Sequence, residues 1–326
     1  MQQKKIISGL DVIKFIMAIL IVDIHVKGTL NLPSPILNNI IFPIEGIAVP
    51  LFFIISAFLF FKKLRIVDDK NRTLFLFEKR ICTLYLFWII IWSPIILIQK
   101  SYHHYSILKA VELFFKDFFF GYVFDASWFL GALIVGVPII FVLSRILKKE
   151  ILVLIFPLII YLYITYQQFL PENWKLIYNW YNDFKNPNLS FPGGLLWISI
   201  GYLMSNESLI KWIKNLNNKM TWSISLILFV LSIFIPFMNI FCITSIFISA
   251  YTLELPEKPQ LYKRLRIYSI LFYVIHDCFK KIPKQLFGLE NGPILFLITI
   301  IFCFLASEII IRMSSLEGFK WLKYAY

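Results

Sequence analysis

Two side chains that could do chemistry stand eleven residues apart in an otherwise apolar stretch near the start of the chain. The stretch LDVIKFIMAILIVDIH runs from Leu10 to His25 and carries Lys14 near one end and His25 at the other. In a helix, eleven residues span about 16 Å along the axis and turn through about 1100°, which returns to nearly the same face. One helix face would therefore carry a cation near its N-terminal end and an imidazole near its C-terminal end.

This arrangement suits a long, thin ligand with phosphate groups at one end. Lys14 could hold a phosphate as a point charge, and His25 could act as a base at the far end of the ligand. Coenzyme A has this shape, with phosphates at its head and a thioester at its tip. The alternative is that Lys14 extends to the membrane surface and that His25 caps its helix in headgroup water.

The composition is that of a membrane protein. Of the 326 residues, 59% are hydrophobic and only 16% are charged, whereas a soluble protein has about 45–50% apolar and about 25% charged residues. The formal net charge of +13 would suit nucleic-acid binding, but the basic residues lie in short segments between apolar runs. Such segments are typical of topology signals, so we expect a lipid bilayer as surroundings and no nucleic-acid partner. The 4 cysteines form no CxxC pair and predict neither a disulfide framework nor a metal site.

Long apolar runs predict an all-α, polytopic membrane protein with about ten transmembrane helices. The stretch 222–255 is too long for one ordinary helix and has Pro236 and Asn239 near its middle, so we expect two helices there. The other predicted helices lie near residues 9–28, 43–61, 81–98, 127–147, 151–170, 190–205, 268–285 and 292–311. Ten spans place most of the 32 Lys and Arg residues on the side of the N-terminus, which predicts two cytoplasmic termini. We expect residues 1–326 to form a single integral membrane domain.

Polar residues at membrane depth are costly and are therefore candidates for function. Glu45 opens the second predicted helix on the outer side, where it could approach His25 and fix the imidazole tautomer, or could lie in interfacial water. Asp23 does not share the helix face of His25 but could meet a neighbouring helix. His276, midway along the ninth predicted helix, is either a hydrogen-bonded interior residue or part of the site.

Three further residues lie at the ends of predicted helices. Arg80 directly precedes the third predicted helix and can face the helix bundle. Trp128 opens the fourth in the stretch SWFLGAL, a position where interfacial tryptophan is common. Asp11 stands three residues before Lys14 and could be no more than its local counter-ion.

These stretches, in this order, resemble the acyltransferase-3 family of integral membrane acyltransferases. The first helix of that family typically reads arginine, ten residues, then histidine, and Lys14 stands here in place of the arginine. GIAVPLFFIISAFLF resembles its second helix, with Ala57 in place of a glycine. EKRICTLYLFW resembles the entry to its third helix, with Arg80 as the first of two arginines and Thr83 in place of the second. SWFLGAL and YVIH resemble later elements of the family.

The resemblance implies a membrane acyltransferase that moves an acyl group other than an aminoacyl group, usually acetyl from acetyl-coenzyme A. The acceptor would be a hydroxyl of a cell-surface or lipid-linked glycan at the outer face of a bacterial cell membrane. The acyl-coenzyme A would be a donor substrate, with no permanently bound cofactor. The glycan, the acyl group (acetyl or a larger one such as succinyl) and the route (direct or through an acyl-histidine) stay open.

The predicted site contains residues with three roles. His25 and Glu45 would be catalytic, Lys14 and Arg80 would bind coenzyme A, and Trp128 and His276 would bind substrate, with no metal. The competing hypothesis is a polytopic transporter of a glycan-related or small-molecule substrate. Ten helices, a broken helix pair and buried ionisable groups would also fit a carrier, although the sequence has no visible inverted repeat.

Overall fold

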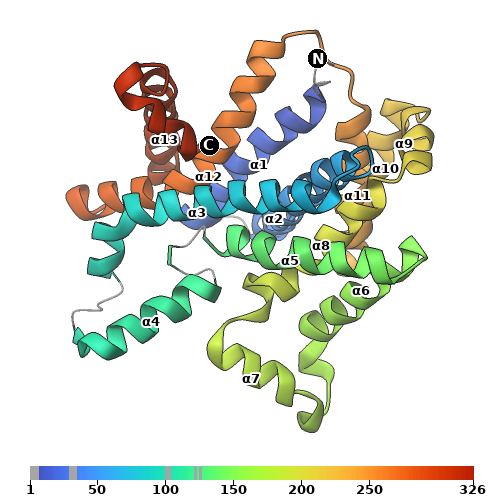
Figure 1. The fold of residues 1–326 in the computed structure, drawn as a ribbon, viewed down its shortest axis with the longest axis horizontal. Coiled ribbons are helices and arrows are strands. Elements are labelled where there is room, and N and C mark those ends of the chain that lie inside the picture. Colours follow the sequence, from blue (N-terminus) through green and yellow to red (C-terminus); the bar gives the residue numbers. More distant parts are fainter. Residues whose placement is uncertain (1–6, 29–34, 100–103, 121–122, 125–126) are drawn as a thin grey trace. The chain divides into compact units, whose positions relative to one another are not determined.

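Helices make up nearly all of the structure, a computed structural model that describes residues 7–28, 35–99, 104–120, 123–124 and 127–326 (Figure 1). These residues contain no strand, which confirms the all-α fold class. The α-helices are α1 (Ser8–Val26), α2 (Pro35–Leu64), α3 (Lys70–Gln99), α4 (Ile107–Phe120), α5 (Ser127–Ile146), α6 (Glu150–Tyr166), α7 (Leu176–Phe184), α8 (Phe191–Met204), α9 (Glu207–Lys214), α10 (Asn218–Phe234), α11 (Met238–Thr252), α12 (Pro259–Phe287) and α13 (Pro293–Met313). Short 3₁₀ helices follow α6 and α7, and a longer one, η5 (Glu317–Ala325), follows α13.

Some of these helices are long and apolar enough to cross a membrane on their own. Within the described ranges they are Pro43–Leu64, Ser127–Ile146, Glu150–Phe169 and Pro293–Met313, with a fifth if α9 and α10, bent by 103°, form one span. The count of about ten spans and the cytoplasmic termini stay predictions. Helix α1 carries Asp11, Lys14 and Asp23, so it needs partners on other helices before it can be stable in lipid.

The chain divides into two compact units, one of residues 1–55 with 207–326 and one of residues 56–206. In the first unit α1 packs along α12, α12 packs against α13, and α10 packs against α11. In the second unit α8 packs against α5 and α6, and α5 packs against α3. The guanidinium of Arg65 ties three chain segments of the second unit together, because it donates to Glu150 at 2.7 Å and to Ser205 at 2.9 Å.

The predicted break within residues 222–255 is confirmed. Helix α10 ends at Phe234 and α11 begins at Met238, with Pro236 between them. Proline has no amide hydrogen to continue the helical ladder, and its ring clashes with the preceding turn. The structure also has three helices, α4, α7 and α9, in segments that the sequence suggested only as loops. All three are too short for the length criterion that identified the predicted spans.

Helix α1 approaches α11 closely at Gly9. A Cβ atom added there would lie 2.0 Å from the carbonyl oxygen of Ala250, closer than any real contact. We expect Gly9→Ala to lower the free energy of unfolding by about 1–3 kcal/mol, the usual cost of overpacking. Thermal unfolding of the purified protein in detergent micelles measures this change.

Gly46 in α2 supplies the matched control for Gly9. A Cβ atom there would meet nothing within 4 Å, and alanine in a helix interior is favoured over glycine by about 0.5–1 kcal/mol. Gly46→Ala should therefore leave the unfolding midpoint unchanged or raise it. A midpoint for Gly9→Ala equal to that of Gly46→Ala would contradict the close approach of α1 and α11.

Candidate functional site

The packing of α1 along α12 brings two histidine rings together. The ring centroids of His25 and His276 lie 4.7 Å apart, with an angle of 58° between the ring planes. These residues are far apart in the sequence, and only the pairing of the first helix with a late one makes them neighbours. The sequence analysis named both histidines but did not predict that they touch.

Both imidazole rings are held in one tautomer by their own helices. Nδ1 of His25 lies 2.8 Å from the carbonyl oxygen of Ile21, and Nδ1 of His276 lies 3.0 Å from that of Phe272. A carbonyl oxygen only accepts hydrogen bonds, so each Nδ1 must carry the hydrogen. In the neutral ring the lone pair is then on Nε2, which is the form that a general base requires.

The two histidines differ in burial. His25 is half-buried, whereas His276 is 0% exposed and its Nε2 has no hydrogen-bond partner among the described residues. His25 is thus the more exposed of the two rings, and His276 is enclosed by the protein. The predicted role of His276 in contacting substrate stays a prediction.

Two buried carboxyl groups lie near the C-terminal end of α1. Asp23 and Glu45 are 3% and 4% exposed, and their side chains interact with each other. Asp23 thus meets a neighbouring helix, as predicted, and Glu45 is buried in its unit instead of lying in interfacial water. The partner shown for Glu45 is Asp23, and the contact predicted between Glu45 and His25 stays a prediction.

At the other end of α1, the partner of Asp11 is on α12. The guanidinium of Arg266 donates two hydrogen bonds to the two carboxylate oxygens of Asp11, at 2.8 and 2.6 Å. The expectation that Asp11 would be only the local counter-ion of Lys14 is therefore wrong. The ammonium of Lys14 lies 5.7 Å from the ring centre of Phe52 on α2, within the range of a cation–π contact.

Helix α12 continues beyond His276 with a buried ion-pair cluster. The carboxylate of Asp277 lies 2.8 Å from the ammonium of Lys280 and 2.6 Å from that of Lys281. The stretch HDCFKK contained the signal for this cluster, because residues three and four positions apart are neighbours on a helix. The sequence analysis missed both lysines. Lys280 is four residues after His276, so it lies one helical turn further along the same face.

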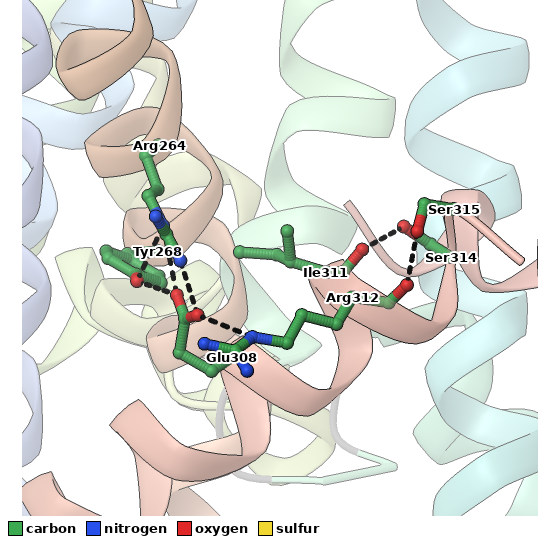
Figure 2. A network of polar contacts seen from close by, with 7 residues as sticks. All are labelled: Arg264, Tyr268, Glu308, Ile311, Arg312, Ser314 and Ser315. Carbon is green, nitrogen blue, oxygen red and sulfur yellow. Dashed lines mark hydrogen bonds and ion pairs between the residues drawn. The ribbon is translucent and has the colours of Figure 1, made fainter.

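A second polar network joins α12 to α13 (Figure 2). The carboxylate of Glu308 accepts hydrogen bonds from Arg264 and Tyr268, and Arg312 lies 3.4 Å from the same group. The ring of Tyr268 in turn lies 5.9 Å from that of Phe15, the neighbour of Lys14. This network fixes the side of α12 that faces α13, and thereby supports the position of α12 against α1.

The remaining predicted site residues belong to the second unit. Arg80 is exposed on α3, and Trp128 is half-buried at the start of α5, two helices that pack against each other. The hydroxyl of Thr83 donates to the carbonyl of Lys79 at 2.7 Å in its own helix. Binding of one coenzyme A by Lys14 and Arg80 stays a prediction.

Glu78, two residues before Arg80 and ahead of the predicted span 81–98, gives the second unit a pH-dependent stability. Burial raises the pKa of this carboxyl from 4.5 to about 8, and its Oε1 is buried without a hydrogen bond to any described residue. Between these two pH values the native chain keeps a proton that the unfolded chain loses. Raising the pH from 4.5 to 8 should therefore destabilise the protein, and the loss should level off above pH 8.

Replacing Glu78 with glutamine removes this titration. We expect Glu78→Gln to unfold at the same temperature as wild type near pH 4.5. As the pH rises to 8, the variant should unfold at increasingly higher temperatures than wild type at the same pH. Thermal midpoints of both proteins across this range give the comparison, with the low-pH point as internal control. A constant difference between the two midpoints would show that Glu78 does not hold a proton in the native state.

The described residues include no group of three or more His, Cys, Asp or Glu side chains arranged to hold a metal ion. Apolar helices that can cross a membrane, together with a half-buried imidazole whose Nδ1 donates to the carbonyl of Ile21, define an integral membrane protein with a candidate general base. The family model for an acyltransferase domain matches residues 7–313. The chain belongs to this family, acyltransferase-3, and is a membrane acyltransferase. No curated protein and no solved structure matches the chain.

Proposed function

We propose that the protein transfers an acetyl group from acetyl-coenzyme A to a hydroxyl of a cell-surface carbohydrate, with His25 as the general base. The observation that carries the proposal is the tautomer of His25. Its Nδ1 hydrogen is bound to the carbonyl of Ile21 at 2.8 Å, so the Nε2 lone pair of the accessible ring is ready to take a proton. Family membership supplies the reaction class, acyl transfer.

The proposed reaction needs no group beyond the two substrates and the imidazole. Nε2 of His25 accepts the proton of the sugar hydroxyl while the oxygen attacks the thioester carbonyl carbon. The carbon–sulfur bond then breaks, and the thiolate takes the proton from His25, which restores the neutral ring. An alternative route forms an acyl-histidine first. Trapping acetylated His25 in the absence of a carbohydrate would exclude a purely direct transfer.

The other proposed roles follow the sequence and the local geometry. Lys14, near the opposite end of α1 from His25, would hold the phosphates of coenzyme A together with Arg80. Glu45 would act on His25 indirectly, through Asp23, with which it forms a buried carboxyl pair. Trp128 would contribute to carbohydrate binding. We place the enzyme in a bacterial cell membrane, where it would meet cell-surface or lipid-linked glycans.

The proposal is tested with membranes that contain the protein, acetyl-coenzyme A labelled in the acetyl group, and the surface glycans of the host. We expect labelled ester on the glycan and an equal amount of free coenzyme A, formed only when glycan is present. Membranes from cells that lack the protein are the control. Uptake of label without ester formation would instead support the transporter hypothesis and overturn the proposal.

A further inference from the structure

The Nε2 atom of His276 is a buried hydrogen-bond acceptor without a donor. The residue is 0% exposed, and the structure gives this atom no partner. Leaving such a group unsatisfied has a cost, and most buried polar groups in proteins are hydrogen-bonded. Nδ1 of the same ring makes an ordinary bond to the carbonyl of Phe272, so the ring is held in place with its acceptor unused. An acceptor kept in this state needs an explanation.

The ring of His25 is a polar group close to this acceptor. Its centroid lies 4.7 Å from that of His276, a separation that brings the edges of two imidazoles within hydrogen-bonding reach after a small tilt. In the neutral state His25 has no hydrogen on Nε2, because its hydrogen is on Nδ1 and bound to the carbonyl of Ile21. Neutral His25 and neutral His276 then both carry a lone pair on Nε2, so neither Nε2 can donate a hydrogen bond to the other.

We propose that Nε2 of His276 is a hydrogen-bond acceptor reserved for protonated His25, which makes His276 a positioning residue for the transfer reaction. The inference rests on the proposed function of His25. When His25 takes the proton of the sugar hydroxyl, its new Nε2–H is shared between the sugar oxygen and Nε2 of His276. The proton stays on His25 until the thiolate removes it, so the net reaction is unchanged.

The proposal predicts an effect on the rate and not on substrate binding. The hydrogen bond is absent from the resting enzyme and forms only as His25 becomes charged. Such an interaction lowers the activation barrier and does not strengthen substrate binding. Hydrogen bonds to charged groups are stronger than neutral ones. Losing this bond should therefore lower kcat by about 10- to 100-fold, with KM for acetyl-coenzyme A and for the glycan changed by less than about 3-fold.

Two amide substitutions at position 276 distinguish the proposed acceptor role of Nε2 from the structural bond that Nδ1 makes to Phe272. The amide of glutamine is as many bonds from Cα as Nε2 of histidine, whereas the amide of asparagine is one bond shorter and corresponds to Nδ1. His276→Gln can accept a bond from protonated His25, and His276→Asn can only replace the bond to Phe272. We expect His276→Asn to lose about 10- to 100-fold in kcat and His276→Gln to stay within about 5-fold of wild type.

The measurement is kcat and KM for wild type, His276→Gln, His276→Asn and His25→Ala in the labelled-acetyl assay, with the thermal unfolding midpoint of each. Equal kcat for the Gln and Asn variants overturns the inference. If both variants are near wild type, His276 has no role in the reaction. If both are inactive, His276 itself exchanges the proton. A change confined to KM overturns it as well. A His25→Ala variant as active as wild type overturns the proposed function itself, which distinguishes the two failures.

Discussion

Replacing His25 with alanine should reduce acetyl transfer by about 10²- to 10⁴-fold, the usual contribution of a positioned general base. The variant should still fold, because the bond from Nδ1 to the carbonyl of Ile21 is made within α1 itself. KM for acetyl-coenzyme A should change little, since the proposed phosphate contacts are elsewhere. The labelled-acetyl assay in membranes, normalised to the amount of folded protein, measures the loss.

His104 provides the matched control for His25. It is an exposed histidine of the second unit, and His104→Ala removes an imidazole but leaves the sequences of α1 and α12 unchanged. We expect this variant to transfer acetyl at the wild-type rate. Equal activity of the two variants would mean that the paired histidines of α1 and α12 are not the site of proton transfer, and the proposed mechanism would have to be abandoned.

Separating Asp11 from Arg266 should have the largest effect on stability. The carboxylate of Asp11 is 5% exposed and accepts two hydrogen bonds from a guanidinium that is 35% exposed. Breaking a buried ion pair by removing one partner costs about 3–5 kcal/mol. Because the Arg266 side chain is partly exposed, its charge is partly screened once Asp11 is gone. We therefore expect Asp11→Ala to lower the free energy of unfolding by about 2–3 kcal/mol. Chemical or thermal unfolding in detergent micelles gives the value.

A double-mutant cycle shows whether the loss comes from the pair. Asp11→Ala, Arg266→Ala and the double variant should not be additive, and the double variant should be more stable than the sum of the single losses implies. The coupling between the two sites should be about 1–2 kcal/mol. Strict additivity would mean that the two side chains act independently, and that the bidentate contact contributes nothing to holding α1 against α12.

The sequence was informative wherever the signal is local. Runs of apolar residues located the helices, and Pro236 located the break between α10 and α11, because both signals depend on neighbouring residues alone. Family motifs also singled out His25 and His276. Periodicity along one helix, however, does not tell which helix will pack against it. The contact of His25 with His276, and that of Asp11 with Arg266, therefore had no counterpart in the sequence analysis.

Polar residues were the hardest to interpret from the sequence. Glu308 stands among apolar residues in the last predicted helix, and the sequence does not indicate its contacts with Arg264 and Tyr268 on α12. Lys280 and Lys281 follow Asp277 at helical spacing, and this local signal was sufficient to predict the ion pairs that the sequence analysis missed. Short amphipathic helices such as α7 were missed because a search for spans discards segments of nine residues.

The pairing of the first helix with a late one has a consequence for how the protein is made. Arg266 is 255 residues after Asp11 in the chain. At about 5–20 residues per second, about 13–50 s pass between the synthesis of the carboxylate and that of its partner. During this interval the nascent α1 has its acidic groups but neither Arg266 nor His276. Helix α1 thus leaves the ribosome long before α12 and reaches its native surroundings only after α12 has been made.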